Sequence, residues 1–186
     1  YARLKDHDMI DYEFAGGTIG NTMHNYSVLS DDRSVLLGVM CENIKIGSYA
    51  YRFVSKTSTR VDLEHLQPVD GPIGRCFTLI DESGERTFAI SPGLMNRLRP
   101  ESISQELIAN SSALVISAYL MRTEGEDTMT EAALKAVEYA NAANVPVVLS
   151  LGTKFLIEQD PEWWQNFVND HVDILAMNEE EGLAIT

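Results

Sequence analysis

The chain has 186 residues, 45% of them hydrophobic, which is enough for one globular domain with a substantial core. Its 14 Lys and Arg residues against 28 Asp and Glu residues give a net charge of −14, which would repel the backbone of polymeric DNA or RNA. No apolar run is long enough to span a membrane, and no segment resembles a secretory signal. We therefore expect a soluble cytoplasmic protein, with Cys41 and Cys76 as reduced thiols.

The first predicted elements are a strand, a glycine-rich turn and a helix. Apolar and acidic residues alternate over residues 10–14, as in a half-buried strand, and helical spacing follows from about residue 23. Between them lies Gly16-Gly17-Thr18-Ile19-Gly20-Asn21. Glycines permit positive φ and close approach of a ligand, the first N–H groups of a helix are free to bind one, and an amide can pair with a hydroxyl. This turn predicts a small ligand, although the glycines could instead only turn the chain.

The middle of the chain predicts a strand at residues 34–40, a helix at residues 46–54 and then a β-hairpin. Apolar and polar residues alternate over residues 75–80 and 85–90, on either side of a turn at residues 81–84 that contains Gly84. We expect one face of this hairpin to be wet.

From residue 100 the pattern alternates between helices and strands. Helices are predicted at residues 101–108, 130–143 and 162–170, and strands at residues 113–117, 145–151 and 172–177. This order predicts parallel strands joined by crossover helices, and the continuous apolar runs fit central strands. Pro161 is placed to begin a helix, in which Trp163 and Trp164 are expected as core and rim packing.

Ligands of such sheets bind beyond the carboxyl ends of the strands, where several polar residues lie. Arg122 and Lys154 could hold an anion, or could be exposed surface cations. Asn178 and Glu181 could hold Mg²⁺ through water, or could form a helix cap. The four histidines show no zinc-ligand spacing. Magnesium beside an anion site indicates phosphoryl transfer.

With these residues in order, the chain resembles the ribokinase-like, or phosphofructokinase-B, family of sugar and nucleoside kinases. The resemblance rests on Gly16-Gly17-x-x-Gly20-Asn21, on the hairpin through Gly84-Glu85-Arg86, and on Asn178-x-x-Glu181. Within the family, residues 15–26, 71–80 and 149–155 are most similar to bacterial kinases of inosine and guanosine. The resemblance implies an α/β fold: a three-layer sandwich with a mostly parallel sheet and a small β lid, present here in part.

The resemblance also implies roles for these residues. The enzyme would transfer the γ-phosphoryl group of ATP to the 5′-hydroxyl of inosine or guanosine. Gly16, Gly17, Thr18, Ile19, Gly20 and Asn21 would form the ribose site. Arg122 would face the forming monophosphate, Lys154 would lie near the ATP phosphates together with Asn178, and Asn178 and Glu181 would organise Mg²⁺. At Lys154 the chain departs from the family, since many members have Asp-x-Asn-x-Arg where this chain has Ser150-Leu151-Gly152-Thr153-Lys154.

The family's late Gly-Ala-Gly-Asp motif, which carries the catalytic base, does not occur in this sequence, so no catalytic residue is assigned. We expect residues 1–186 to be one kinase domain that is incomplete at both ends, with lid strands at about residues 8–15 and 74–91. The lid of the family often pairs between subunits, which implies a possible homodimer. The alternatives are a sugar kinase, or a nucleoside-binding or dimerisation module without catalysis.

Overall fold

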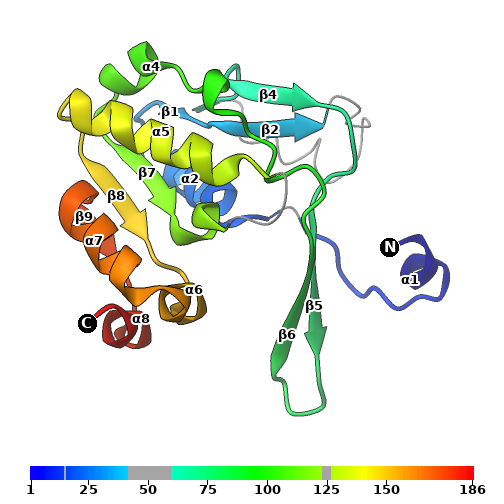
Figure 1. The fold of residues 1–186 in the computed structure, drawn as a ribbon. Helices are drawn as coiled ribbons and strands as arrows, with labels where there is room; N and C mark the ends of the chain where they lie inside the picture. The colour runs from blue at the N-terminus through cyan, green and yellow to red at the C-terminus, as the bar shows by residue number, and fades with distance from the viewer. Residues whose placement is uncertain (15, 42–59, 123–126) are drawn as a thin grey trace. The chain divides into compact units, whose positions relative to one another are not determined.

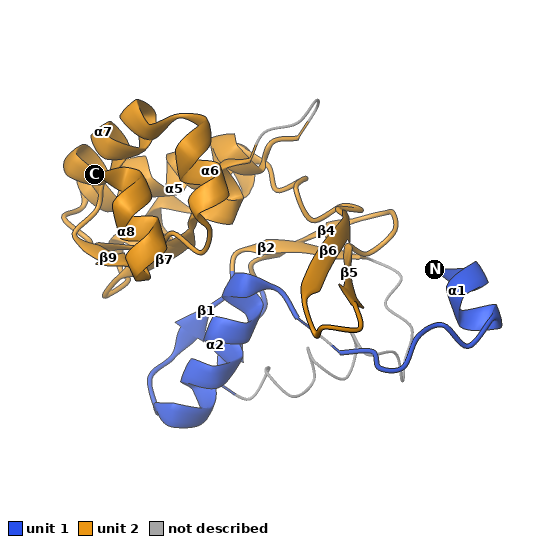
Figure 2. Cartoon of the chain, turned by 90° about the horizontal axis from the view of Figure 1, so that it is seen from below, with its two compact units in different colours: residues 1–36, 43–64 blue, residues 37–42, 65–186 orange. Residues whose placement is uncertain are grey.

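The computed structural model describes residues 1–14, 16–41, 60–122 and 127–186 (Figure 1). The chain forms two compact units, which Figure 2 shows in different colours. The first comprises Tyr1–Leu36 and Asn43–Glu64, and the second comprises Leu37–Glu42 and His65–Thr186. The predicted helix at residues 46–54 lies outside the described residues, as does Ala15.

The first unit contains α1 (Ala2–Asp6), α2 (Thr18–Leu29) and the short parallel strands β1 (Ser34–Val35) and β3 (Val61–Asp62). Helix α2 begins directly after Gly17, whose φ of 111° is disfavoured for residues with a side chain. Arg60 ties the end of this helix to β3, since its Nη1 donates to the carbonyl oxygens of Ser27 and Ser30 at 3.0 and 3.2 Å. The predicted glycine turn into a helix is confirmed.

Residues 9–14 do not form the predicted strand. The side chains of Tyr12 and Phe14 are 79% and 80% exposed, and their rings stack with centroids 6.0 Å apart. A strand needs a neighbour for its backbone hydrogen bonds, and no described strand pairs with this segment. The strand expected at residues 10–14 is therefore not formed, because alternation alone supplies no pairing partner, and the lid boundary at about residues 8–15 stays a prediction.

The predicted strand at residues 34–40 is two strands. In the second unit, β2 (Gly38–Cys41) pairs in parallel with β4 (Leu66–Val69), whereas β1 pairs with β3. The interruption falls at Leu36 and Leu37, between the two pairings. The apolar run predicted a buried strand, but only Ser34 is buried and residues 35–40 are half-buried, and the run could not show that its two halves have different partners.

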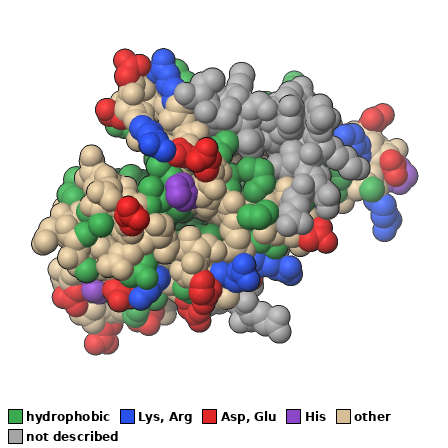
Figure 3. Space-filling view, turned by 90° about the horizontal axis from the view of Figure 1, so that it is seen from above, with side chains coloured by type: hydrophobic (Ala, Val, Ile, Leu, Met, Phe, Trp, Pro, Cys, Tyr) green, Lys and Arg blue, Asp and Glu red, His purple; other side chains and the backbone are tan. Residues whose placement is uncertain are grey.

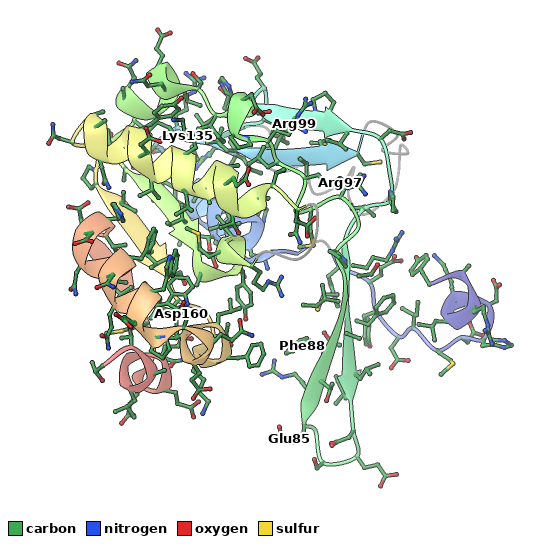
Figure 4. The ribbon with its side chains drawn as sticks, in the orientation of Figure 1. Glu85, Phe88, Arg97, Arg99, Lys135 and Asp160 are labelled. Carbon is green, nitrogen blue, oxygen red and sulfur yellow. The ribbon has the colours of Figure 1, made fainter. Side chains whose placement is uncertain are left out.

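The predicted hairpin is confirmed as antiparallel β5 (Arg75–Ile80) and β6 (Arg86–Ser91). Its turn is organised by Asp81, whose Oδ1 accepts from the hydroxyl and the N–H of Ser83 at 2.6 and 2.8 Å. These hydrogen bonds, the one from the hydroxyl first, lower the pKa of the Asp81 carboxyl. Phe88 on β6 is 56% exposed, and Figure 4 shows it and Glu85 on the hairpin.

The centre of the second unit is a parallel sheet of β7 (Leu114–Ser117), β8 (Val147–Ser150) and β9 (Ile174–Ala176), with β8 in the middle. The predicted parallel order is confirmed. The helical elements of this unit are η1 (Pro100–Ser102), α4 (Gln105–Ala109), η2 (Ala118–Met121), α5 (Met129–Ala142), α6 (Lys154–Gln159), α7 (Pro161–His171) and α8 (Glu179–Ile185). In Figure 1, α5 and α7 lie on the viewer's side of the sheet. None of the described helices is both long and apolar enough to cross a membrane.

The helix predicted at residues 101–108 is divided into η1 and α4. The reason lies at Ser104, whose extended backbone precedes α4 and whose hydroxyl accepts from the N–H of Leu107 at 3.2 Å. A serine in this position caps a new helix, so the chain begins again at Gln105.

The core of the second unit combines buried residues of the sheet with residues of α4, α5, α6, α7 and α8. Val147 and Leu149 of β8 and the following Leu151 have no exposed surface. Ala132, Ala136 and Ala140 recur every four residues on α5, and they belong to the same buried cluster. Small side chains at this spacing form one helix face, which allows the helix backbone to approach the sheet closely.

Helix α7 confirms the expectations for its start and for its tryptophans. Pro161 is in the first turn, and Oδ1 of Asp160 accepts from the N–H of Trp163 at 3.1 Å (Figure 4). Trp164 is 4% exposed, and its Nε1 donates to the carbonyl oxygen of Leu156 at 3.0 Å. The Trp163 ring is half-buried and stacks on Phe167 with centroids 5.0 Å apart.

We expect Leu149→Ala to lower the free energy of unfolding by about 2–5 kcal/mol, because it empties a fully buried site in the central strand. Urea unfolding followed by tryptophan fluorescence measures this, since both tryptophans of the chain lie in α7 of the same unit. The matched control is Leu134→Ala on α5, where the side chain is 38% exposed and the loss should be smaller. Equal losses at the two positions would contradict this account of the core.

Candidate functional site

The three strands of the central sheet end level with one another. Ser117 at the end of β7 pairs with Ser150 at the end of β8, which in turn pairs with Ala176 at the end of β9. Because the strands are parallel, the segments that follow them leave the same edge of the sheet. These segments contain Arg122, Lys154, Asn178 and Glu181. The four residues therefore follow strands that end at one edge of the sheet. The sequence also predicts that the glycine turn lies on the same rim, and this, like the roles of all these residues, stays a prediction.

The glycine-rich segment belongs to the first unit, and the four residues at the sheet edge belong to the second. Gly16 and Gly17 precede α2, and Thr18, Ile19, Gly20 and Asn21 form its first turn. The amide of Asn21 lies beside Gly16, with Nδ2 4.0 Å from where a Cβ on Gly16 would be. The N-cap residue Gly17 has no side chain, and among the described residues no side chain caps α2, so its first N–H groups are available to a ligand.

The segment after β7 begins with η2 and reaches Arg122. Ser117 caps η2 and is 1% exposed. The guanidinium carbon of Arg122 lies 5.3 Å from the centroid of the Tyr119 ring, within the range of a cation–π contact. Arg122 is half-buried. Its positive charge is therefore held against an aromatic ring, and no described carboxylate pairs with it.

The segment after β8 leads directly into α6, a helix that the sequence analysis did not predict. Thr153 is its N-cap, with Oγ1 accepting from the N–H of Phe155 at 3.3 Å. Lys154 is its first residue, and its exposed Nζ lies 3.7 Å from Oε2 of Glu180. The signal was Thr153 itself, a favoured capping residue two positions before the apolar run that begins at Phe155.

The segment after β9 is a complete capping box. Oδ1 of Asn178 accepts from the N–H of Glu181 at 2.8 Å, and Oε2 of Glu181 accepts from the N–H of Asn178 at 3.1 Å. Nδ2 of Asn178 also donates to Oε1 of Glu181 at 3.0 Å. Glu181 is 6% exposed, so its two carboxylate oxygens are buried against Asn178. The helix-cap alternative is confirmed as a structural fact, and it leaves a metal role open.

The chemistry of Asn178 and Glu181 suits Mg²⁺ only in part. Amide and carboxylate oxygens are the ligands that Mg²⁺ prefers, but both carboxylate oxygens already accept hydrogen bonds. No group of three or more His, Cys, Asp or Glu side chains able to hold a metal occurs among the described residues. The pair fits an ion that keeps its water shell and shares its other ligands with a substrate.

A surface hollow lies elsewhere, in the first unit. It has a volume of about 720 Å³ and is lined by residues 31–33 and 60–64. It contains Asp31, Asp32, Asp62 and Glu64 but none of the candidate site residues. Acidic and basic side chains are interspersed on the face seen in Figure 3.

Comparison with known proteins gives the family. Residues 45–186 match the model of the pfkB family carbohydrate kinases. The chain belongs to the pfkB family. The resemblance recognised in the sequence is therefore confirmed, and with it the ribokinase-like α/β fold.

Among curated relatives, guanosine-inosine kinase of Escherichia coli K12 is 67% identical over 186 residues, which is 100% of this chain and 43% of that protein. The chain thus spans less than half of that relative's length. Among solved structures, adenosine kinase from Sinorhizobium meliloti matches with a TM-score of 0.78 and 22% identity over 94% of this chain and 52% of that one. A probable sugar kinase from Rhizobium etli CFN 42 matches with a TM-score of 0.78 and 21% identity over 94% and 51%.

We expect Asn178→Ala to destabilise α8 by about 1–2 kcal/mol, because it removes the Oδ1 cap and the Nδ2 donor to the buried Glu181 carboxylate. Only the Nδ2 donor and the Oδ1 acceptor are lost, since the backbone N–H remains. Hydrogen exchange of the Glu181 amide should become faster. Asn178→Ser is the matched control, because serine also caps helices. The Glu181 amide should exchange more slowly in the serine variant than in the alanine variant. Equal exchange in both variants would contradict the capping role.

Proposed function

We propose that this chain is part of a nucleoside kinase that transfers the γ-phosphoryl group of ATP to the 5′-hydroxyl of inosine or guanosine. The observation that carries the proposal is the 67% identity to a guanosine-inosine kinase along all 186 residues. The structural likenesses do not choose the substrate, because adenosine and sugar kinases match with equal TM-scores. Since the chain covers 43% of that relative, the activity is proposed for the longer protein.

In this proposal the glycine-rich segment binds the nucleoside. Gly16 and Gly17 let the ribose approach bare backbone, and the amide of Asn21 pairs with a ribose hydroxyl. The free N–H groups at the start of α2 add further donors. The open space around Gly17, where a Cβ would meet no atom within 4 Å, supports this role.

The edge of the sheet supplies charge for the phosphates. Phosphoryl transfer depends mainly on positioning and on neutralising the charge around the transferred group. Arg122 faces the forming monophosphate, and Lys154 and Asn178 lie near the phosphates of ATP. The ion pair of Lys154 with Glu180 is solvent-exposed, so little is lost when the lysine turns to a phosphate.

Magnesium would be held through water by Asn178 and Glu181. When bound, the ion would offset negative charge on the ATP phosphates. The capping box fixes the carboxylate of Glu181 at the edge of the sheet, which prepares it to accept hydrogen bonds from the ion's water shell.

The exposed β5–β6 hairpin is proposed as the lid of the site. Closing it would exclude water and suppress hydrolysis of ATP. Leu79, Ile80 and Phe88 are more than half exposed, which is consistent with apolar contacts to a ligand or to the lid of a second subunit. We also infer a cytoplasmic location, and a single kinase domain that includes both compact units.

The test is ATP-dependent phosphorylation of guanosine, inosine, adenosine and ribose by this chain and by the complete protein. We expect activity on guanosine and inosine in the complete protein, and none in this chain, because no residue here is assigned as the base. Phosphorylation of ribose alone would favour a sugar kinase. Binding of guanosine without any transfer would favour the non-catalytic module.

We expect Glu181→Gln in the complete protein to reduce kcat by about tenfold or more and to raise the Mg²⁺ concentration needed for half-maximal activity, because it removes the negative charge. Glutamine keeps one oxygen to accept from the N–H of Asn178, which preserves the capping box, but its Nε2 cannot accept from Nδ2 of Asn178, so a modest fall of the melting temperature is expected beside the loss of activity. The control is Glu138→Gln, which removes a surface carboxylate paired with Lys135 on α5. An unchanged Mg²⁺ dependence would exclude the metal role.

A further inference from the structure

Tyr119 connects the segments that follow two neighbouring strands. It lies in η2 directly after β7, where its N–H donates to the hydroxyl of the buried Ser117 at 3.4 Å. Its own hydroxyl donates to the carbonyl oxygen of Gly152, after β8, at 3.2 Å. The backbone of the tyrosine is therefore fixed at the end of β7, and its hydroxyl is fixed to the segment after β8.

Gly152 is adapted to this contact. Its φ is 68°, in the left-handed region, and a Cβ built on it would lie 2.9 Å from Cε2 of Tyr119. Carbon atoms in packed proteins stay about 3.5 Å or more apart, so any side chain here would displace the ring. Glycine is required both for the backbone conformation and for the approach of Tyr119.

The same ring also supports Arg122. The guanidinium carbon lies 5.3 Å from the ring centroid, and the arginine is half-buried. A cation–π contact is stronger where water is partly excluded. One side chain thus contacts the arginine through its ring and the turn before Lys154 through its hydroxyl.

The ion pair described for Lys154 restrains this lysine only weakly. Its ion pair with Glu180 has 51% and 73% of the two side chains exposed, and such pairs hold geometry poorly. Lys154 is two residues after Gly152 and is the first residue of α6, so the position of the Gly152 carbonyl affects the position of the Lys154 backbone. The hydrogen bond from Tyr119 restrains this turn.

We propose that Tyr119 is a positioning residue, which fixes the position of Arg122 relative to the turn at residues 152–154. Two phosphate groups are then bound at the right separation. The inference rests on the proposed function, in which one cation meets the forming monophosphate and the other meets ATP. Tyr119 acts through these two groups and does not itself contact a substrate. Small errors of placement are costly in phosphoryl transfer, since the reaction depends on alignment.

The test compares Tyr119→Phe with Tyr119→Leu in the complete protein. Phenylalanine removes only the hydroxyl, so we expect the KM for ATP to rise about threefold to tenfold while the KM for guanosine stays within about twofold. Leucine also removes the ring, so kcat should fall by about tenfold or more. The matched control is Tyr139→Phe on α5, a tyrosine whose ring likewise lies under a cation, Lys135, which Figure 4 labels on this helix.

A double-mutant cycle separates positioning from general stability. If Tyr119 acts through Arg122, the double variant Tyr119→Leu with Arg122→Gln should have a kcat within about twofold of that of Arg122→Gln alone. If the two substitutions reduced kcat independently, so that their effects multiplied in the double variant, the proposal would be overturned. So would a lowered melting temperature with unchanged kinetic constants, which would show a purely structural tyrosine. If Tyr119→Leu does not fold, the test rests on Tyr119→Phe, in which the KM for ATP should rise and the KM for guanosine should not.

The wild type separates this inference from the proposed function. If it phosphorylates ribose instead of guanosine, the proposed substrate is wrong, and the same variants are compared with ribose. If it phosphorylates none of these acceptors, calorimetry of ATP binding replaces kinetics. Weaker ATP binding by Tyr119→Phe than by the wild type and Tyr139→Phe would support the inference, and equal binding would overturn it.

Discussion

The register of three parallel strands determines where chemistry is possible in the second unit. Ser117, Ser150 and Ala176 are level because β8 pairs with both neighbours without an offset. A slip of one residue in either pairing would turn every side chain of that strand to the other face, so the register is protected by the buried valine and leucine residues of β8. Besides stabilising the unit, the core therefore fixes the register that brings the three polar segments after β7, β8 and β9 to one edge of the sheet.

At that edge, local backbone chemistry and candidate function use the same residues. Thr153 and Asn178 cap the helices that begin after β8 and β9, and Ser117 caps the 3-10 turn after β7. Each cap satisfies a backbone N–H that would otherwise lack a partner. The edge is thus ordered before any ligand arrives, which reduces the entropy lost on binding.

Sequence reasoning predicted elements wherever a local pattern and its neighbours agreed. The apolar runs at β7 and β8, Pro161 at the start of α7 and the hairpin turn all carry their signal within a few residues. It failed where pairing decides the structure, as at residues 9–14 and at the interruption between β1 and β2. The contact of Tyr119 with Gly152 joins residues 33 positions apart, so only a fold could reveal it. The roles of the glycine-rich segment, Arg122, Lys154, Asn178 and Glu181 remain predictions that came from the family resemblance, because geometry places side chains without assigning substrates.

The capping box at the start of α8 also bears on which ion the proposed magnesium site would select. Both oxygens of the buried Glu181 carboxylate accept hydrogen bonds from Asn178, and the side-chain oxygen Oδ1 of Asn178 accepts from the N–H of Glu181. Calcium requires six to eight oxygen ligands in its first shell and would find these atoms largely committed. A smaller ion that retains its water needs only acceptors for that water. The cap that begins the helix would therefore also discriminate between cations by the strength of their hydration.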